Sequence, residues 1–531
     1  SNSEVRSMSK ARNLATLLTT DGSVKTTKYA DSVGGQSTFV ASGALSDGTT
    51  LILNSDGTVS EIGQSSTSVT YTESIPAGGY TQVKTGSTNA ININFDPNTP
   101  NSFIITYSDA QNGGYVTALV GTLSGTAMSF GTPVVVHSVN TNDVEAAFDP
   151  NTANQFVLLY SNNNTANPGS LQVGTISGTT VTFNAAIAFN SPDRALIGTK
   201  SGGIEFDPHN AGKFLLTYND RDNTNLVCRI GTISSGSVTL GTKQIFKSSA
   251  AAHSTYANGS YDLTTSGAIL VSYFSTNGYL RAGTVNSGTN ISWGTPVAYH
   301  TGTNHYTSIA SSKGEAGKFL VSYYDTPNGG RGQALVATVS GLTVTVGSEI
   351  NYAAGPFYIR QALSDPNTSG RFIIVGQDGT APYKLRMYVV TVSGTVPSVS
   401  SLYEISNSTY SSWGQADFNP NKSGQLVTVG SGSSSQTYTM AIAHQLAATE
   451  TISTPTNLTA TNFIGISSAA YADTATATLN LQGGTATNLS GLTAGSTYYV
   501  QNDGTLGTSA GNPSVEAGKA LSTTSILLKG I

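Results

Sequence analysis

The sequence predicts an all-β protein organised around a β-propeller, with four-stranded blades that recur at a period of about 53 residues. Two repeated motifs indicate this fold. The first is Phe-Asp-Pro-Asn or Phe-Asp-Pro-His before a short apolar strand, at Phe95, Phe148 and Phe206, with weaker copies at Asp365 and Phe418. The second is Gly-Thr-x-Ser-Gly or a near match, whose Thr stands at positions 122, 175, 232, 284, 338 and 391. So regular a period is typical of a repeat architecture.

One repeat, residues 89–138, illustrates the expected blade. Strand-like stretches cover residues 89–94, 102–107, 115–123 and 128–136, and the motif lies between the first two. Proline fixes φ at a turn position and aspartate hydrogen-bonds its own backbone there, so we interpret the motif as a hinge whose Phe packs inward. Four antiparallel strands in this length match a propeller blade.

The number of blades is open from sequence alone. Counting second strands gives eight units, from Leu51–Leu53 to the one at Leu426, or seven if the first is only partial. The last unit has three clear strands, and an unpaired sheet edge invites aggregation. We therefore expect a segment on the N-terminal side, such as residues 23–26, to supply the missing outer strand.

The flanks differ from the repeats. In residues 1–20, Val5, Met8, Ala11, Ala15 and Leu18 recur at helical spacing, which predicts a helix. We assign residues 1–37 to an N-terminal helical attachment segment that also has room for the closing strand, residues 38–450 to the propeller, 451–456 to a linker and 457–531 to a small C-terminal β-module.

Composition restricts the function. Charged residues are 10% of 531, the net charge is −5, and no basic block is present, which argues against nucleic-acid binding. No apolar run approaches the ~20 residues of a membrane span. The single cysteine, Cys228, lies in a strand-like run, excludes a disulfide within the chain, and is expected to be a buried core residue.

The C-terminal module carries a resemblance. Its motifs are Asn462-Phe-Ile-Gly-Ile466, Gly491-Leu492-Thr493 before Tyr498-Tyr499-Val500-Gln501, and a final Ile-Leu-Leu-Lys529. This segment resembles a module found at the C-termini of tail-fibre and other virion proteins of marine bacteriophages, including cyanophages. The short N-terminal stretch Ser9-Lys-Ala-Arg-Asn-Leu14 also resembles openings of phage fibre proteins. The resemblance implies a structural or adhesive virion protein and carries over no catalytic residue.

The sequence carries few signatures of catalysis. The sialidase box Ser-x-Asp-x-Gly-x-x-Trp has only a poor match at Ser55-Asp56-Gly57-Thr58, and the densest acidic cluster, around Asp220 and Asp222, is typical of a solvated turn. His300 and His305 lack neighbouring ligands at metal-binding spacing. We therefore expect no catalytic, cofactor or metal site.

The expected loops are rich in Tyr, Asn, Ser and Gly, which suits adaptable binding surfaces, although ordinary propeller turns have the same composition. The candidate binding residues are His300, Asn304, His305, Tyr306 and Tyr410. Two units that lack the full motif, at Tyr261-Asp262-Leu263 and at Ser312-Lys313-Gly314, flank the loop over residues 300–306. We interpret them as blades in which selection for structure has relaxed.

The sequence and the resemblance together predict a non-enzymatic virion protein, with a tail fibre or appendage that attaches to the host surface as the first choice. The expected partners are other virion proteins and a host surface glycan, in a homo-oligomer for which such fibres favour a trimer. A capsid decoration or scaffold protein is one alternative. A carbohydrate-active enzyme on a propeller is another.

Overall fold

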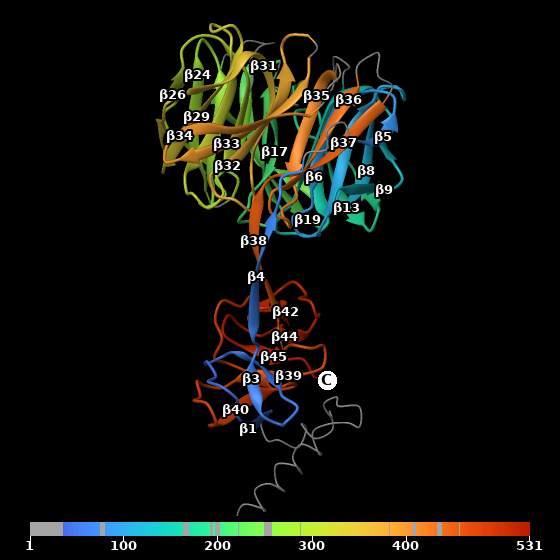
Figure 1. Cartoon of the computed structure of the whole chain (residues 1–531). Coiled ribbons are helices and arrows are strands. Elements are labelled where there is room, and N and C mark those ends of the chain that lie inside the picture. The colour runs from blue at the N-terminus through green and yellow to red at the C-terminus, as the bar shows by residue number, and fades with distance from the viewer. Residues whose placement is uncertain are drawn as a thin grey trace, which may run out of the picture. The chain divides into compact units, whose positions relative to one another are not determined.

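The computed structural model describes residues 35–74, 80–162, 169–191, 195–196, 202–220, 222–248, 257–286, 288–381, 383–405, 410–432, 438–455 and 457–530. Across these ranges the chain forms strands, turns and bends and no helix, which confirms the all-β class (Figure 1). The helix predicted over residues 1–20 and the closing strand predicted over residues 23–26 lie outside the described ranges. The described part of the chain has no helix with the length and apolarity of a membrane span.

The chain divides into two compact units, one of residues 71–448 and one that combines residues 1–70 with 449–531. The larger unit is the propeller, and its sheets make seven blades. The count of eight is wrong because Leu51–Leu53 belongs to a strand of the smaller unit. For the same reason the predicted propeller, residues 38–450, wrongly includes the segment 38–70, which belongs to the smaller unit.

The blades follow one another along the chain. Blade 1 contains β6 (Thr88–Phe95), β7 (Ser102–Asp109), β8 (Tyr115–Ser124), β9 (Ala127–Phe130) and β10 (Val134–His137); blade 2 contains β11 (Thr141–Phe148), β12 (Gln155–Asn162), β13 (Ser170–Ser177), β14 (Thr180–Phe183) and β15 (Ile187–Ala188); blade 3 contains β16 (Ala195–Leu196), β17 (Gly202–Phe206), β18 (Lys213–Asp220), β19 (Asn225–Ser234), β20 (Ser237–Leu240) and β21 (Gln244–Lys247). Blade 4 contains β22 (Ala257–Tyr261), β23 (Ala268–Phe274), β24 (Gly278–Val285), β25 (Ile291–Trp293) and β26 (Val297–His300); blade 5 contains β27 (Asn304–Ser311), β28 (Lys318–Asp325), β29 (Arg331–Ser340), β30 (Thr343–Val346) and the start of β31 (Ile350–Ser364). Blade 6 contains the rest of β31, β32 (Arg371–Asp378), β33 (Leu385–Ser393) and β34 (Val396–Glu404); blade 7 contains β35 (Tyr410–Phe418), β36 (Gln425–Gly432) and β37 (Tyr438–Gln445).

Each blade is an antiparallel meander, as predicted from residues 89–138. In blade 1, the second strand β7 is buried along nearly its whole length, as expected for a strand covered on both faces. The fourth strand is broken into β9 and β10, which both pair with β8. Burial of Cys228 in β19 is also confirmed, since this side chain has no exposed surface.

The seventh blade is completed by β5 (Thr81–Thr85), which pairs antiparallel with β37 and places Lys84 opposite Thr439. The closing strand therefore comes from the N-terminal side of the blades, but it is residues 81–85 and not 23–26. The Lys84 ammonium also lies 2.7 Å from the Asp109 carboxylate of blade 1. This partly buried pair joins the last outer strand to the first blade and closes the ring.

The Asp-Pro-Asn motif is the hinge between the first and second strands, as predicted, and it also joins neighbouring blades. One carboxylate oxygen of Asp149 accepts the backbone N–H of Asn151 at 3.0 Å in its own turn. The other accepts the N–H of Gly212, in blade 3, at 2.7 Å. Asp96 and Asp262 form the same pair of bonds in blades 1 and 4. We call this arrangement the aspartate latch.

The phenylalanine of the motif packs inward, as predicted. Phe95 is 3% exposed, and its ring centroid lies 5.2 Å from that of Phe103 on the second strand. Phe148 and Phe156 repeat this pair at 5.4 Å. Such tilted aromatic pairs contribute about 1 kcal/mol beyond their buried area, so they hold the two inner strands of a blade together at the hinge.

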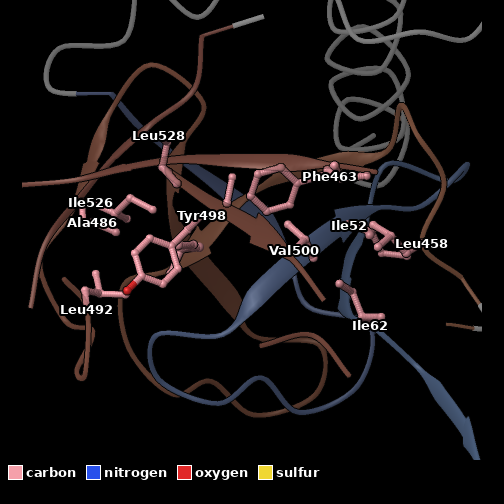
Figure 2. Close-up of a cluster of buried hydrophobic side chains, with 14 residues drawn as sticks. Ile52, Ile62, Leu458, Phe463, Ala486, Leu492, Tyr498, Val500, Ile526 and Leu528 are labelled. Carbon is pink, nitrogen blue, oxygen red and sulfur yellow. The ribbon is translucent and has the colours of Figure 1, made fainter. Parts of the chain in front are cut away.

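The smaller unit is assembled from both ends of the chain. One sheet contains β1 (Gln36–Val40), β2 (Thr50–Leu53), β3 (Val59–Glu61), β39 (Phe463–Ser467) and β40 (Thr476–Leu481), and the other contains β41 (Thr485–Ala486), β42 (Thr497–Val500), β43 (Leu506–Gly507), β44 (Glu516–Ala520) and β45 (Ile526–Leu528). Figure 2 shows Ile52 and Ile62 from the N-terminal segment in one core with Phe463, Val500 and Leu528. The C-terminal module is thus completed by residues 36–62, and the propeller is inserted within it.

The segment predicted as a linker is also a strand. Residues 451–455 are the end of β38 (Ala448–Pro455), which pairs with β4 (Gln64–Tyr71) in a two-stranded sheet. The prediction failed because Thr, Ser and Pro dominate this stretch, and these residues are common in loops. Pairing with the incoming chain satisfies the backbone groups that a free linker would expose to water.

Candidate functional site

The first strands of all seven blades line a central cavity of about 410 Å³. At one end the lining residues are the prolines of the hinge motif, Pro97, Pro150, Pro208, Pro366 and Pro420. At the other end they include Thr307 and Arg360. The cavity therefore runs along the propeller axis from the hinge end of the blades to the opposite end.

A ring of hydrogen bonds joins adjacent first strands around this cavity. In each case a side chain of one blade accepts a backbone N–H of the next, as when Asn92 accepts Ala146 N–H at 3.1 Å and Ser308 accepts Ala362 N–H at 2.9 Å. Five more side chains accept a backbone N–H in the same way: Glu145 from Ile204, Glu205 from Tyr261, Asn258 from Ile309, Gln361 from Ala416, and Asp417 from Phe95. The ring satisfies backbone donors that the sheets leave unpaired.

Three of these acceptors are carboxyl groups in the cavity wall. Burial raises the pKa of Glu145 and of Glu205 to about 8, and that of Asp417 to about 7. The hydrogen bonds from Ile204 and Tyr261 oppose these shifts without cancelling them, and Glu205 adds to the shift of Glu145 by charge repulsion. The side chains of both glutamates keep partial contact with solvent through the cavity, so these carboxyls can exchange protons with it.

Sequence reasoning missed this trio. Each residue lies one or three positions before the aromatic residue of the hinge motif, at Glu145, Glu205 and Asp417. The sequence did contain a signal for these residues: an acidic residue lies within a predicted first strand, and the first strands line the propeller axis. Gly203 is a second signal, because a Cβ atom there would lie 2.7 Å from a carboxylate oxygen of Glu145.

The two ends of the cavity differ in their surroundings. At the hinge end the polypeptide enters and leaves the propeller, since Ser74 and Gln445 form a bridge there and Leu446 donates its N–H to Gly424 of a hinge turn. The opposite end is formed by the starts of the first strands and the ends of the second strands. A binding surface at that end would face away from the point where the chain enters and leaves the propeller.

Five partly exposed aromatic rings lie together at that opposite end, in blades 4 to 6. We call them the aromatic shelf; they are Phe274, His305, Tyr306, Tyr324 and Tyr358. The rings of Tyr324 and Tyr358 are parallel within 8° with centroids 5.4 Å apart. Tyr306 packs edge-on against both, at 5.8 and 5.3 Å. His305 connects this group to Phe274, with ring centroids 5.8 Å apart.

Irregular backbone builds the shelf. Tyr306 has φ of 51°, which is unusual for a bulky residue, and the pairing of β27 with β28 shifts register between His305 and Ser308. The pairing of β31 with β32 shifts between Ile359 and Gln361, so Arg360 is the extra residue of a bulge. Bulges re-aim side chains and are common beside functional sites. These two bring the Arg360 guanidinium carbon to 5.7 Å from the Tyr306 ring centroid.

Of the predicted binding residues, the structure brings His305 and Tyr306 into the shelf. Asn304 is fully buried, and its side-chain amide donates a hydrogen bond to the Thr307 hydroxyl at 3.2 Å. It therefore stabilises the bulge and does not face a ligand. His300 is also an internal residue, 3.2 Å from the Asp325 carboxylate and only 10% exposed. These two are corrected from contact residues to supporting ones. Tyr410 begins β35, and its side chain lies outside the described part of the structure.

The sequence missed Phe274, Tyr324, Tyr358 and Arg360, which come from three other strands. Phe274 and Tyr324 are aromatic residues at or near the end of a second strand, which is visible in the sequence. Tyr358 and Arg360 lie at a bulge, which only the backbone of the structure reveals. Burial lowers the pKa of His305, so its imidazole is neutral near pH 7 and acts as another aromatic face. Burial also raises the pKa of Tyr324.

The interpretation of the incomplete motifs needs one correction. In blade 4, Asp262 retains the full aspartate latch, although Leu263 replaces proline. In blade 5, Ser312 takes the place of aspartate, and its hydroxyl donates to Glu315 at 2.8 Å within the same turn. The loss of the latch is therefore confined to one of the two units, the blade that contributes His305, Tyr306 and Tyr324 to the shelf.

Among the described residues, no group of three or more His, Cys, Asp or Glu side chains is arranged to hold a metal ion.

Comparison with known proteins bears on the fold. No protein-family model matches the sequence, and no curated protein does. Among solved structures, the BP39L lectin from Burkholderia pseudomallei matches with a TM-score of 0.50 at 12% identity, over 66% of this chain and 94% of that chain. Sqt1 from Chaetomium thermophilum matches with a TM-score of 0.41 at 11% identity, over 70% and 98%. At these identities the likeness extends to the architecture alone.

Proposed function

We propose that this chain is a non-enzymatic adhesive protein of a bacteriophage particle, a tail fibre or similar appendage, and that the aromatic shelf binds glycans of the host surface. The shelf carries the proposal. Sugar rings present C–H groups that pack on aromatic faces, and partly exposed tyrosines supply such faces together with hydroxyl groups for hydrogen bonds.

Three features support the binding role. The shelf stands on two backbone irregularities, and strained or bulged backbone persists mainly where function requires it. It lies at the end of the blades opposite to the point where the chain enters and leaves. The fold of the larger unit is also that of a protein named as a lectin, which is a precedent for this use of the architecture.

The virion role rests on the C-terminal module, whose motifs resemble those of marine phage fibre proteins. In such a particle the smaller unit would contact other virion proteins, in a homo-oligomer and most simply a trimer, while the propeller presents its shelf. Cryo-electron microscopy of the phage particle tests this part directly. Density for this chain in the capsid shell, and not in a tail appendage, would replace the fibre assignment with a decoration role.

Binding is tested with purified full-length protein on an array of bacterial surface glycans. Replacing both Tyr324 and Tyr358 by alanine is expected to reduce binding at least tenfold, because the parallel pair is lost. The matched control is Tyr383→Ala, which removes a tyrosine that is 44% exposed in the loop before β33. Equal binding by wild type and the double variant would rule out the shelf as the site.

A glycoside hydrolase is the second candidate function, and the carboxyl groups in the wall of the central cavity favour it. Glycoside hydrolysis uses two carboxyl groups, one with a raised pKa, and Glu145 and Glu205 both have raised values. Both, however, accept hydrogen bonds from backbone N–H groups of the neighbouring blade, which is a structural task. Incubation with host polysaccharide decides between the two: release of oligosaccharides by wild type but not by Glu205→Gln would establish the enzyme.

A further inference from the structure

We infer that the ligand of the aromatic shelf is an acidic sugar, one that carries a carboxylate, and that Arg360 recognises the charge. This inference rests on the proposed function and concerns the class of glycan. Arg360 stands where the shelf meets the axial cavity: its guanidinium lies against Tyr306 and its side chain lines the cavity.

Charge within the cavity supports an anion. Among the described residues that line it, Arg360 is the only basic one, and the acidic ones are Glu145, Glu205 and Asp417. Burial raises the pKa of all three carboxyls, so at neutral pH the two glutamates are mostly protonated. Among the described lining residues, the guanidinium is therefore the one group that carries a permanent charge.

The backbone also fixes the direction of the Arg360 guanidinium. Arg360 is itself the extra residue of a bulge, and only 7% of it is exposed, so the bulge and not surface flexibility sets its direction. Packing on the Tyr306 ring further fixes the plane of the guanidinium. A fixed, planar fork of N–H donors matches the two oxygens of a carboxylate better than a mobile lysine does.

The placement suggests how the sugar is oriented. With its ring on Tyr324 and Tyr358, which both pack against Tyr306, a sugar would direct one substituent toward the cavity mouth, where Thr307 and Arg360 lie. A carboxylate at that substituent would exchange water for a charge-assisted hydrogen bond in a partly enclosed site. The corresponding neutral sugar would gain the stacking contact alone.

The test uses glycan pairs that differ only in the acidic group, such as glucuronate-terminated and glucose-terminated oligosaccharides on the same array. Wild-type protein should bind the acidic member at least tenfold more tightly. Arg360→Gln should remove that preference, measured as the ratio of acidic to neutral binding within the variant, whereas Arg360→Lys should retain part of it. Thermal unfolding of each variant establishes that the propeller is intact.

The outcomes separate this inference from the proposed function. Equal binding of both members by wild type, or an unchanged preference in Arg360→Gln, overturns the acidic-sugar inference while the shelf remains a glycan site. Loss of all binding in the double Tyr324 and Tyr358 variant, together with a preference that Arg360→Gln abolishes, supports both. Absence of binding to either member by wild type counts against both.

Discussion

The two ends of the propeller blades are built on different principles. At the hinge end, the aspartate latch recurs with nearly the same distances, as for Asp149 and Asp262, whose inter-blade bonds are both 2.7 Å. At the opposite end, register shifts between the first two strands occur in blades 1, 2 and 7 as well as in blades 5 and 6. Within the described residues, only blades 5 and 6 combine such shifts with a left-handed tyrosine and a cluster of aromatic rings. The repeated contacts hold neighbouring blades together, whereas the proposed binding site lies where the blades depart from the repeat.

Removing the closing strand should have the largest effect. A fragment that begins at Thr88 lacks β5, so the outer edge of β37 and the carboxylate of Asp109 lose their partners. We expect this fragment to aggregate, because an exposed strand edge pairs with other chains. The control is the fragment over residues 71–448, which should be monomeric with cooperative unfolding. Size-exclusion chromatography compares them; a monomeric shorter fragment would show that closure by β5 is dispensable.

Breaking one latch should be the next largest effect. Asp149→Ala leaves the buried N–H of Gly212 and the partly buried N–H of Asn151 without their acceptor, and the two losses together cost about 2 kcal/mol. Asp149→Asn should cost less, because Asn419 occupies the equivalent position in blade 7 and still accepts the N–H of Asn421. Urea unfolding measures both. Equal stability of wild type and Asp149→Ala would mean that the latch does not hold the blades.

The inner wall between the two ends should respond to pH. A carboxyl group whose pKa rises on folding stabilises the folded state. This stabilisation is fully present below the pKa of the unfolded state, near 4.5, and is lost as the pH rises through the pKa of the folded state. For Glu145 and Glu205 the folded value is about 8. The thermal midpoint should therefore fall by several degrees between pH 5 and pH 9.

The double variant Glu145→Gln and Glu205→Gln cannot ionise at these positions, so its midpoint should change much less over the same range. Scanning calorimetry at matched ionic strength gives the comparison. An identical pH dependence in wild type and in the double variant would assign the effect to other groups.

The smallest effect on stability, with a selective effect on binding, is expected at the shelf end. A Cβ atom at Gly330 would lie 2.2 Å from the hydroxyl oxygen of Tyr324, so Gly330→Ala must displace that ring. Gly329 has a similar φ, 71° against 77°, but a Cβ there meets nothing within 4 Å. Both alanine variants place an L-residue at positive φ, which costs about 1 kcal/mol in each case. Only Gly330→Ala should lose glycan affinity, by about tenfold, on the same array.

The repetitive part of this structure could be predicted from the sequence. The all-β class, the four-stranded blade, the hinge at Phe95 and the burial of Cys228 follow from periodicity and turn chemistry, which are local. The blade count failed because Leu51–Leu53 has the composition of a blade strand but pairs with Phe463–Ser467, on the far side of the whole propeller sequence. Pairing across an inserted domain leaves no trace in local composition.

The proposed binding surface was predictable only in part, for a related reason. His305 and Tyr306 stand in a loop-like stretch whose composition is visible in the sequence. Tyr324 and Tyr358 stand in strands and resemble ordinary core residues until the register is known. The shelf depends on a register shift in each of two neighbouring blades, and a one-residue shift changes which face a side chain occupies.

The bridge between Ser74 and Gln445 has a consequence for how such proteins diversify. It holds the two ends of the propeller side by side, with backbone bonds of 2.8 and 2.9 Å in both directions. A domain with adjacent ends can be exchanged as a cassette, because its replacement leaves the host module's own strands in register. Under the proposed adhesive role, recombination at these two positions would replace the propeller and its aromatic shelf in one step, while the strands of the smaller unit stay unchanged.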